Sequence, residues 1–244
     1  METSKIADCI DRVYGEHFLA FPLGQLADNR VIGSFFKYQL ESRFQPIVRL
    51  HDGVAIGHDS TVECHAPDGG QIEAARLFAL ALDNSGLVSL DRMVRTLHAL
   101  NYFAIQQGPG RLFLSVQQRL LETVKSDHGR FFERILQQFD IATGRVVIQL
   151  PPRAREDVAL LGRVIRNYRS CGYGVAVEQQ GDDLGWLAAL GDTQPDFIKW
   201  QAASATQAGL EQATRVAQGL GVEPVATVMD RAHHVERPTA MASR

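Results

Sequence analysis

Short apolar runs alternate with segments of helical periodicity along most of the 244-residue chain. This alternation is typical of β/α units and of a largely parallel sheet. The apolar runs predict seven strands, at residues 44–50, 55–64, 112–116, 146–150, 174–178, 197–200 and 224–228. A complete β/α barrel has eight strands, so the pattern is one strand short.

Three of the segments between these runs have apolar residues at every third or fourth position. Residues 158–168 carry one such pattern, and Asp157 stands at its start, where the helix dipole favours a carboxylate. Two more helices are predicted around residues 77–81 and 90–100, with a break between them near Gly86. We expect all three helices to cover the sheet.

Residues 1–43 precede the predicted sheet, and a polar tail follows it. The N-terminal segment contains apolar residues at 18–23 and again at 31–36, so we expect it to pack against the barrel, as helices. Residues 231–244 are polar and include Pro238, which predicts a mobile tail. The chain is thus divided into an N-terminal extension at 1–43, a barrel at 44–230 and a tail at 231–244.

Composition narrows the function classes only slightly. The chain is 45% hydrophobic and 22% charged, as is ordinary for one soluble domain. Its net charge of -3 provides no basic field for nucleic acid, and no apolar run reaches the roughly 18 residues of a spanning helix. The three cysteines are far apart and lack the spacing of a zinc site. We therefore expect a cytoplasmic protein that binds neither nucleic acid nor membranes.

Several segments resemble, in order and spacing, the EAL domain of bacterial cyclic di-GMP phosphodiesterases. The resemblance starts with FQPIV at 44–48 and IGHDSTVE at 56–63, continues through 112–116, 146–150 and 168–178, and reaches PDFIK at 195–199. Collinear matches of this kind are more specific than one short motif. They imply an α/β fold, a β/α barrel of the TIM type. The family's last strand has no counterpart after residue 230, so either the barrel is open at its C-terminal end or the N-terminal segment closes it.

The resemblance also implies where a catalytic site would lie. Family members hydrolyse the nucleotide with two divalent cations, held by acidic residues and an asparagine at the C-terminal ends of the strands. In this chain the family's catalytic positions hold Asp59, Ser115, Gln149, Glu178, Gln179, Lys199 and Thr227. Neutral side chains are weaker ligands for a hard cation than carboxylates. The resemblance therefore predicts a degenerate site without catalytic residues or bound metal, in which magnesium or manganese matters only if residual activity exists.

The positions that would meet the nucleotide are altered as well. Glu63 stands where the family has an arginine, which reverses the charge that faces a phosphate. Gln45, Asp59, Lys199 and Asp230 are the other candidate ligand-binding residues. The alternative for these charged residues is structural: Lys199 neutralises Asp59 or Glu178 in an ion pair.

These observations favour a catalytically inactive EAL-like regulatory protein, in or derived from cyclic di-GMP signalling, that acts by binding a transcription or signalling regulator. One alternative is a receptor that binds cyclic di-GMP without cleaving it. The other is a phosphodiesterase of weak residual activity, in which Asp182 or Asp183 would assist in holding metal. A second copy of the chain is a further candidate partner.

Overall fold

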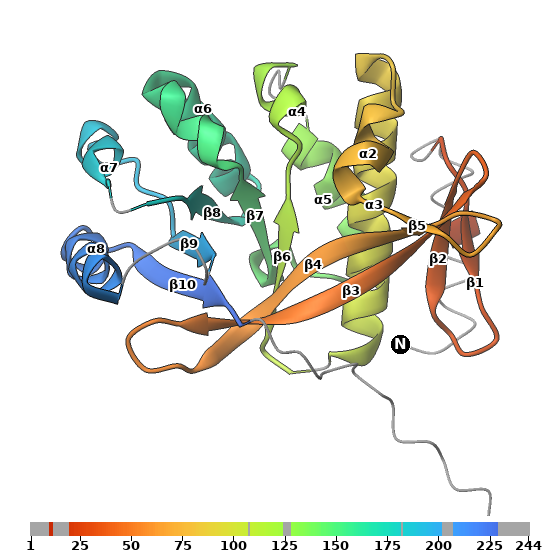
Figure 1. Ribbon diagram of the computed structural model, residues 1–244, viewed down its shortest axis with the longest axis horizontal. Helices are drawn as coiled ribbons and strands as arrows, with labels where there is room; N and C mark the ends of the chain where they lie inside the picture. Colours follow the sequence, from red (N-terminus) through yellow and green to blue (C-terminus); the bar gives the residue numbers. More distant parts are fainter. Residues whose placement is uncertain are drawn as a thin grey trace, which may run out of the picture.

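The computed structural model describes residues 10–11, 20–106, 108–123, 128–181, 183–201 and 207–228. Its strands are β1 (Leu23–Gln25), β2 (Val31–Phe35), β3 (Tyr38–Arg49), β4 (Ala55–His65), β5 (Gln71–Ile72), β6 (Arg111–Ser115), β7 (Val146–Leu150), β8 (Gly174–Gln179), β9 (Phe197–Gln201) and β10 (Glu223–Thr227). Its helices are α2 (Ala74–Ala79), α3 (Asn84–Ile105), α4 (Gln118–Thr123), α5 (His128–Gln138), α6 (Val158–Ser170), α7 (Gly185–Ala189) and α8 (Gln207–Gly219), with 3-10 turns η1 (Thr143–Arg145) and η2 (Pro152–Glu156). The helices lie around the outside of one curved sheet (Figure 1).

Seven of the described strands form a closed barrel, because β3 pairs with both β4 and β10. The strands β4, β6, β7, β8, β9 and β10 follow one another in parallel. β3 is antiparallel to both of its neighbours in the ring. The seven predicted strands are thus confirmed, and the first of them closes the barrel without an eighth.

Residues 20–43 correct the expectation that the N-terminal segment packs as helices, although the separately described residues 10–11 are helical and Ile10 is buried in the core. Residues 23–35 contain strands β1 and β2, which extend the sheet beyond β3 (Figure 1). Val31 and Phe35 are buried while Ile32 is only half-buried, so burial follows the two-residue period of a strand. Asn29, with a φ of 67°, lies in the turn between the two strands, and Asn adopts this conformation more readily than most residues. β3 itself begins at Tyr38, ahead of the predicted boundary at residue 44.

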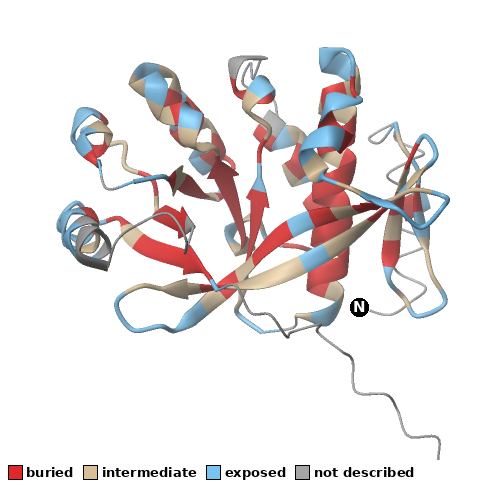
Figure 2. Cartoon of the chain, viewed as in Figure 1, coloured by how far each residue is buried: buried red, intermediate tan, exposed pale blue. Residues whose placement is uncertain are grey.

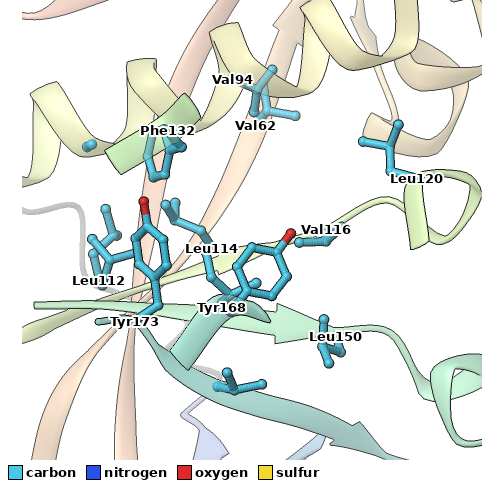
Figure 3. Packing of buried hydrophobic residues seen from close by; sticks show 14 of the residues in the cluster. Val62, Val94, Leu112, Leu114, Val116, Leu120, Phe132, Leu150, Tyr168 and Tyr173 are labelled. Atoms are coloured by element: carbon cyan, nitrogen blue, oxygen red, sulfur yellow. The ribbon is translucent and has the colours of Figure 1, made fainter. Parts of the chain in front are cut away.

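Apolar side chains fill two layers, one inside the barrel and one between the barrel and its helices. The inner layer comprises Ile47, Phe113, Val147, Ala176, Phe197 and Val225. In the outer layer, Phe132 of α5 and Tyr168 of α6 pack near Leu114 of β6 (Figure 3). α3 is buried along most of its length (Figure 2). Close packing in both layers fixes the positions from which the strand ends present their polar side chains.

The three predicted helices are present as α2, α3 and α6, but the break between the first two lies at residues 80–83, because α3 begins at Asn84 and includes Gly86. Asp83 caps α3 by accepting a hydrogen bond of 2.6 Å from the Gly86 N–H, and Asp157 caps α6 by accepting one of 2.8 Å from the Leu160 N–H. These caps satisfy N–H groups that have no partner inside the first turn. None of the described helices combines the length and the apolar character that crossing a bilayer requires.

Candidate functional site

The parallel strands end at one rim of the barrel, which we call the mouth. Enzymes with β/α barrels carry their chemistry at this rim. The predicted site residues Asp59, Ser115, Gln149, Glu178, Lys199 and Thr227 come from β4, β6, β7, β8, β9 and β10 in turn. The strand registers place Ser115 beside Gln149 and Glu178 beside Lys199. The barrel therefore gathers side chains that are far apart in the sequence.

A buried polar network centres on Asp59. Lys199 Nζ forms an ion pair with Asp59 Oδ2, and Gln149 Nε2 donates a hydrogen bond of 2.6 Å to Asp59 Oδ1. The same amide nitrogen donates to Ser115 Oγ at 3.2 Å. Asp59, Gln149 and Lys199 are only 8%, 1% and 4% exposed. Both oxygens of the carboxylate are therefore occupied by donors, and its buried charge is balanced by a buried cation.

Glu178 supplies a second carboxylate at the mouth. Its Oε1 lies 3.9 Å from Lys199 Nζ, which is too long for a hydrogen bond. Burial raises the pKa of Glu178; the positive charge of Lys199 opposes this rise, and the negative charge of Asp59 adds to it. Lys199 is thus shared by two carboxylates but bound directly to Asp59.

Gln179, the next residue along β8, holds a loop instead of joining this network. Its Oε1 accepts hydrogen bonds from Arg155 Nη1 at 2.7 Å and from Trp186 Nε1 at 3.2 Å. Its Nε2 donates to three backbone carbonyls of the loop between β8 and α7, those of Gln180, Gly181 and Asp183, at 3.0 to 3.1 Å. Because the whole amide is committed in this way, Gln179 has a structural role.

Glu63 lies farther along β4 than Asp59, on a part of β4 that extends past its pairing with β6. It forms an ion pair of 2.6 Å with Arg43 Nε on the neighbouring strand β3. The negative charge at this position therefore has its own cation. Gln45 lies opposite Asp59 in the register of β3 and β4, at the edge of the network.

Four further predicted residues do not belong to the described network. Asp230 and Asp182 lie outside the described residues. Asp183 accepts a hydrogen bond of 2.8 Å from the Gly185 N–H at the start of α7, so its carboxylate serves the loop. Thr227 is buried at the end of β10, and its Oγ1 has no hydrogen-bond partner among the described residues.

Comparison with known proteins decides the family. The sequence profile described as the EAL domain matches residues 34–241. The chain belongs to the EAL domain family. A comparison with curated proteins found no match.

Solved structures of other EAL proteins share the fold. YkuI of Bacillus subtilis, in complex with its substrate cyclic di-GMP and calcium, has a TM-score of 0.56 and 22% identity over 76% of this chain and 47% of that one. BlrP1 of Klebsiella pneumoniae, in a calcium and cyclic di-GMP complex, has a TM-score of 0.59 and 18% identity over 76% and 48%. The FimX EAL domain of Xanthomonas citri, in complex with cyclic di-GMP, has a TM-score of 0.60 and 16% identity over 76% of both chains. This chain therefore spans about half the length of the first two proteins.

The donor groups at the mouth of this EAL domain do not fit a pair of divalent cations. Magnesium and manganese sites are built mainly from carboxylate oxygens. Here Asp59 faces the ammonium of Lys199 and the amide N–H of Gln149, both of which repel a cation. Within the described ranges, no group of three or more His, Cys, Asp or Glu residues is arranged to hold a metal.

The structure brings five of the predicted residues into one network, namely Asp59, Ser115, Gln149, Glu178 and Lys199. It also contains the Lys199–Asp59 ion pair that the sequence suggested. The partners of Gln179 and Glu63, which are Arg155 and Arg43, were not predicted. The antiparallel pairing of β3 with β4 is a signal that could have found Arg43. No signal in the sequence links Arg155, in the turn η2, to Gln179.

Proposed function

We propose that this EAL domain is catalytically inactive and acts in cyclic di-GMP signalling by binding another protein. The observation that carries the proposal is the closed network in which Asp59 is bonded to both Lys199 and Gln149. Hydrolysis of a phosphodiester at neutral pH requires an activated water and positive charge at the phosphate, which this family obtains from metal ions. A carboxylate that is already satisfied by an ammonium and an amide has little affinity left for a metal.

Family membership supports the place in cyclic di-GMP signalling. The structures of YkuI, BlrP1 and the FimX EAL domain all contain cyclic di-GMP. The binding of a protein is supported by the contrast between the core and the mouth. Both apolar layers of the barrel are fully packed, whereas the residues at the mouth no longer suit the family's chemistry. One fold can host unrelated functions, so an intact barrel without the family's site is compatible with a function in binding.

A receptor that binds cyclic di-GMP without cleaving it is the second candidate. One observation favours it. Arg43 forms an ion pair of 2.6 Å with Glu63, so the reversed charge at residue 63 is neutralised and repels a phosphate less than an isolated glutamate would. Gln45, opposite Asp59, remains at the mouth as a group that can form hydrogen bonds.

Thermal unfolding with added nucleotide separates these functions, because a ligand that binds only the native state raises the midpoint. We expect cyclic di-GMP to leave the midpoint unchanged in magnesium, in manganese and in chelator, and to be recovered uncut. A raised midpoint with intact nucleotide would establish the receptor instead. The matched variant Glu63→Arg, which restores the charge that the family has at this position, shows whether residue 63 limits binding.

The protein partner requires a second measurement. The purified chain is used as bait in a pull-down without added nucleotide. Each protein recovered is then purified, and its binding to the chain is measured by titration. We expect a transcription or signalling regulator to bind both in the pull-down and in the titration. If no recovered protein binds in the purified system, the proposed mode of action is wrong.

A further inference from the structure

We propose that an unpaired edge of β3, at residues 41–45, is a docking site for an extended segment of the protein partner. The segment would add a strand to the sheet through backbone hydrogen bonds. This inference rests on the proposed function, since it names how the partner is recognised.

On the side of β3 that faces away from β4, two strands pair with it but do not meet. β2 pairs with β3 as far as Leu40, and β10 pairs with it from Ile47 onwards. The Val228 N–H, just after β10, donates to the Pro46 carbonyl at 3.0 Å. Between these points no described strand pairs with β3 on this side, over about 16 Å of extended chain. β2 and β10 approach opposite ends of the β3–β4 ribbon (Figure 1).

The backbone groups in this gap are directed outwards. Consecutive residues of a strand point their N–H and C=O groups to alternate sides. The Leu50 N–H donates to Pro224 and the Pro46 carbonyl accepts from Val228, so even-numbered residues of β3 face the side away from β4. Ser42 and Phe44 therefore offer two N–H and two C=O groups at the edge. Groups of this kind are a template for pairing with another polypeptide.

Asn101 of α3 accounts for the departure of β2 from β3. Continuing the register of Gly33 opposite Leu40 would place Val31 opposite Ser42. Instead, Asn101 Oδ1 accepts from the Val31 N–H at 2.8 Å, and Asn101 Nδ2 donates to the Val31 carbonyl at 2.8 Å. The side-chain amide thus replaces the backbone of β3 as the partner of β2. The backbone groups of Val31 are satisfied in this way, and no strand among the described residues pairs with this edge of β3.

A cavity of about 250 Å³ lies at this gap, lined by Arg30, Val31, Ile32, Glu41, Ser42, Arg43, Phe44, Glu63, Asn101 and Ile105. Ile105, at the end of α3, is 46% exposed and makes one wall apolar together with Phe44. The other wall is polar, because it carries the ion pairs of Arg43 with Glu63 and of Arg30 with Glu41. A strand has side chains on alternate faces, so a segment with an apolar residue towards Ile105 and polar neighbours fits both walls.

The test uses the full chain and, as probe, a phage-displayed library of short linear peptides. In the free protein, hydrogen exchange should be fast at the Ser42 and Phe44 amides and slow at the Leu40 amide. Selected peptides should slow exchange at Ser42 and Phe44. If these two amides are already protected in the free protein, the edge is covered by the chain itself or by a second copy, and the proposal is overturned.

Ser42→Pro removes the N–H from the edge, and Ser42→Ala is its matched control, because both lose the hydroxyl that contacts His98 and Asn101. We expect Ser42→Pro to weaken peptide binding by roughly tenfold or more relative to Ser42→Ala. A second pair keeps the test decisive if Ser42→Pro does not fold. Ile105→Asp should abolish binding, whereas Leu82→Asp, at a side chain 92% exposed, should not.

No peptide enrichment, or equal binding to both members of each pair, would overturn the inference. The proposed function and the proposed site can be distinguished by a separate result. A purified partner protein that binds the Ser42→Pro and Ile105→Asp variants as well as it binds the unchanged chain leaves a protein-binding function in place and removes only the edge of β3 as its site.

Discussion

Lys199 on β9 and Asp59 on β4 form a buried ion pair across the interior of the barrel. Gln149 on β7 donates to the second oxygen of the same carboxylate. Lys199 and Gln149 together engage both oxygens of the Asp59 carboxylate at the mouth, while Gln149 Oε1 has no hydrogen-bond partner among the described residues. The engagement of both Asp59 oxygens is the physical basis for proposing a domain that binds but does not hydrolyse.

Removing the cation should destabilise the fold strongly. Lys199→Met leaves the Asp59 carboxylate buried without a counter-charge, and breaking a buried pair from one side costs about 3 to 5 kcal/mol. The free energy of unfolding, measured in urea, should fall by that amount. The double variant Asp59→Asn with Lys199→Met removes both charges and should recover most of the loss. Unchanged stability of Lys199→Met would show that the pair is not formed.

Stability should depend on His98 in acid. This residue is buried, its Nδ1 lies 2.8 Å from Ser42 Oγ, and burial lowers its pKa to about 3. An unfolded histidine titrates near 6.5, so between about pH 6.5 and pH 3 the unfolded state binds the extra proton. Stability is then lost as the pH falls, by up to about 1.4 kcal/mol per pH unit.

The control for this acid dependence is His98→Gln, which keeps a group that can form hydrogen bonds but does not titrate. Unfolding free energies measured from neutral pH down to pH 4 should fall less steeply for the variant than for the unchanged chain. If the unfolding free energies of the variant and of the unchanged chain fall equally with pH, other groups account for the acid sensitivity. The half-buried His58, whose pKa is also lowered by burial, is one of them.

Gln179→Ala should loosen the loop between β8 and α7. The variant leaves Arg155 and Trp186 without the carbonyl that they share, and the Gln180 and Asp183 carbonyls without this donor. The Gly181 carbonyl keeps the Trp200 Nε1 donor at 3.4 Å. An unpaired polar group costs about 1 to 3 kcal/mol when it is buried, and the loop residues 180, 181 and 183 are exposed, so stability should fall by about 1 kcal/mol. Trp186 fluorescence and hydrogen exchange at residues 180–185 report the loop directly. Gln137→Ala, at an exposed residue with a single contact of 3.4 Å, should change stability by less than about 0.5 kcal/mol.

The strands at 112–116, 146–150, 174–178 and 224–228 could be predicted because all but one or two of their residues are apolar. Residues 146–150 and 174–178 are covered on both faces and read as continuous hydrophobic runs. The N-terminal hairpin could not be predicted in the same way. Phe35 is buried while Phe36, beside it, is 78% exposed, so an apolar cluster concealed a strand and a turn. The Asp28–Asn29 turn signal was the available evidence for strands.

The network at the mouth was only partly predictable. Asp59 and Lys199 are far apart in sequence, and an ion pair of Lys199 with Asp59 or Glu178 was expected because the resemblance placed all three at the same rim. Arg43 was missed because its ion pair is diagonal: the register of β3 and β4 places Thr61 opposite Arg43 and Glu63 opposite Glu41. The open edge of β3 was missed for a different reason: it arises because Asn101, a single amide on α3, replaces the backbone partner of Val31.

The most direct test of the central claim is a hydrolysis assay with the full chain, cyclic di-GMP and either magnesium or manganese, in which the linear dinucleotide is quantified over time. The matched control is the same protein in chelator. The closed network of Asp59, Gln149 and Lys199 predicts no product above the chelator control. Metal-dependent formation of the linear product, abolished by Asp59→Asn, would contradict the account and show that the altered mouth is still an active site.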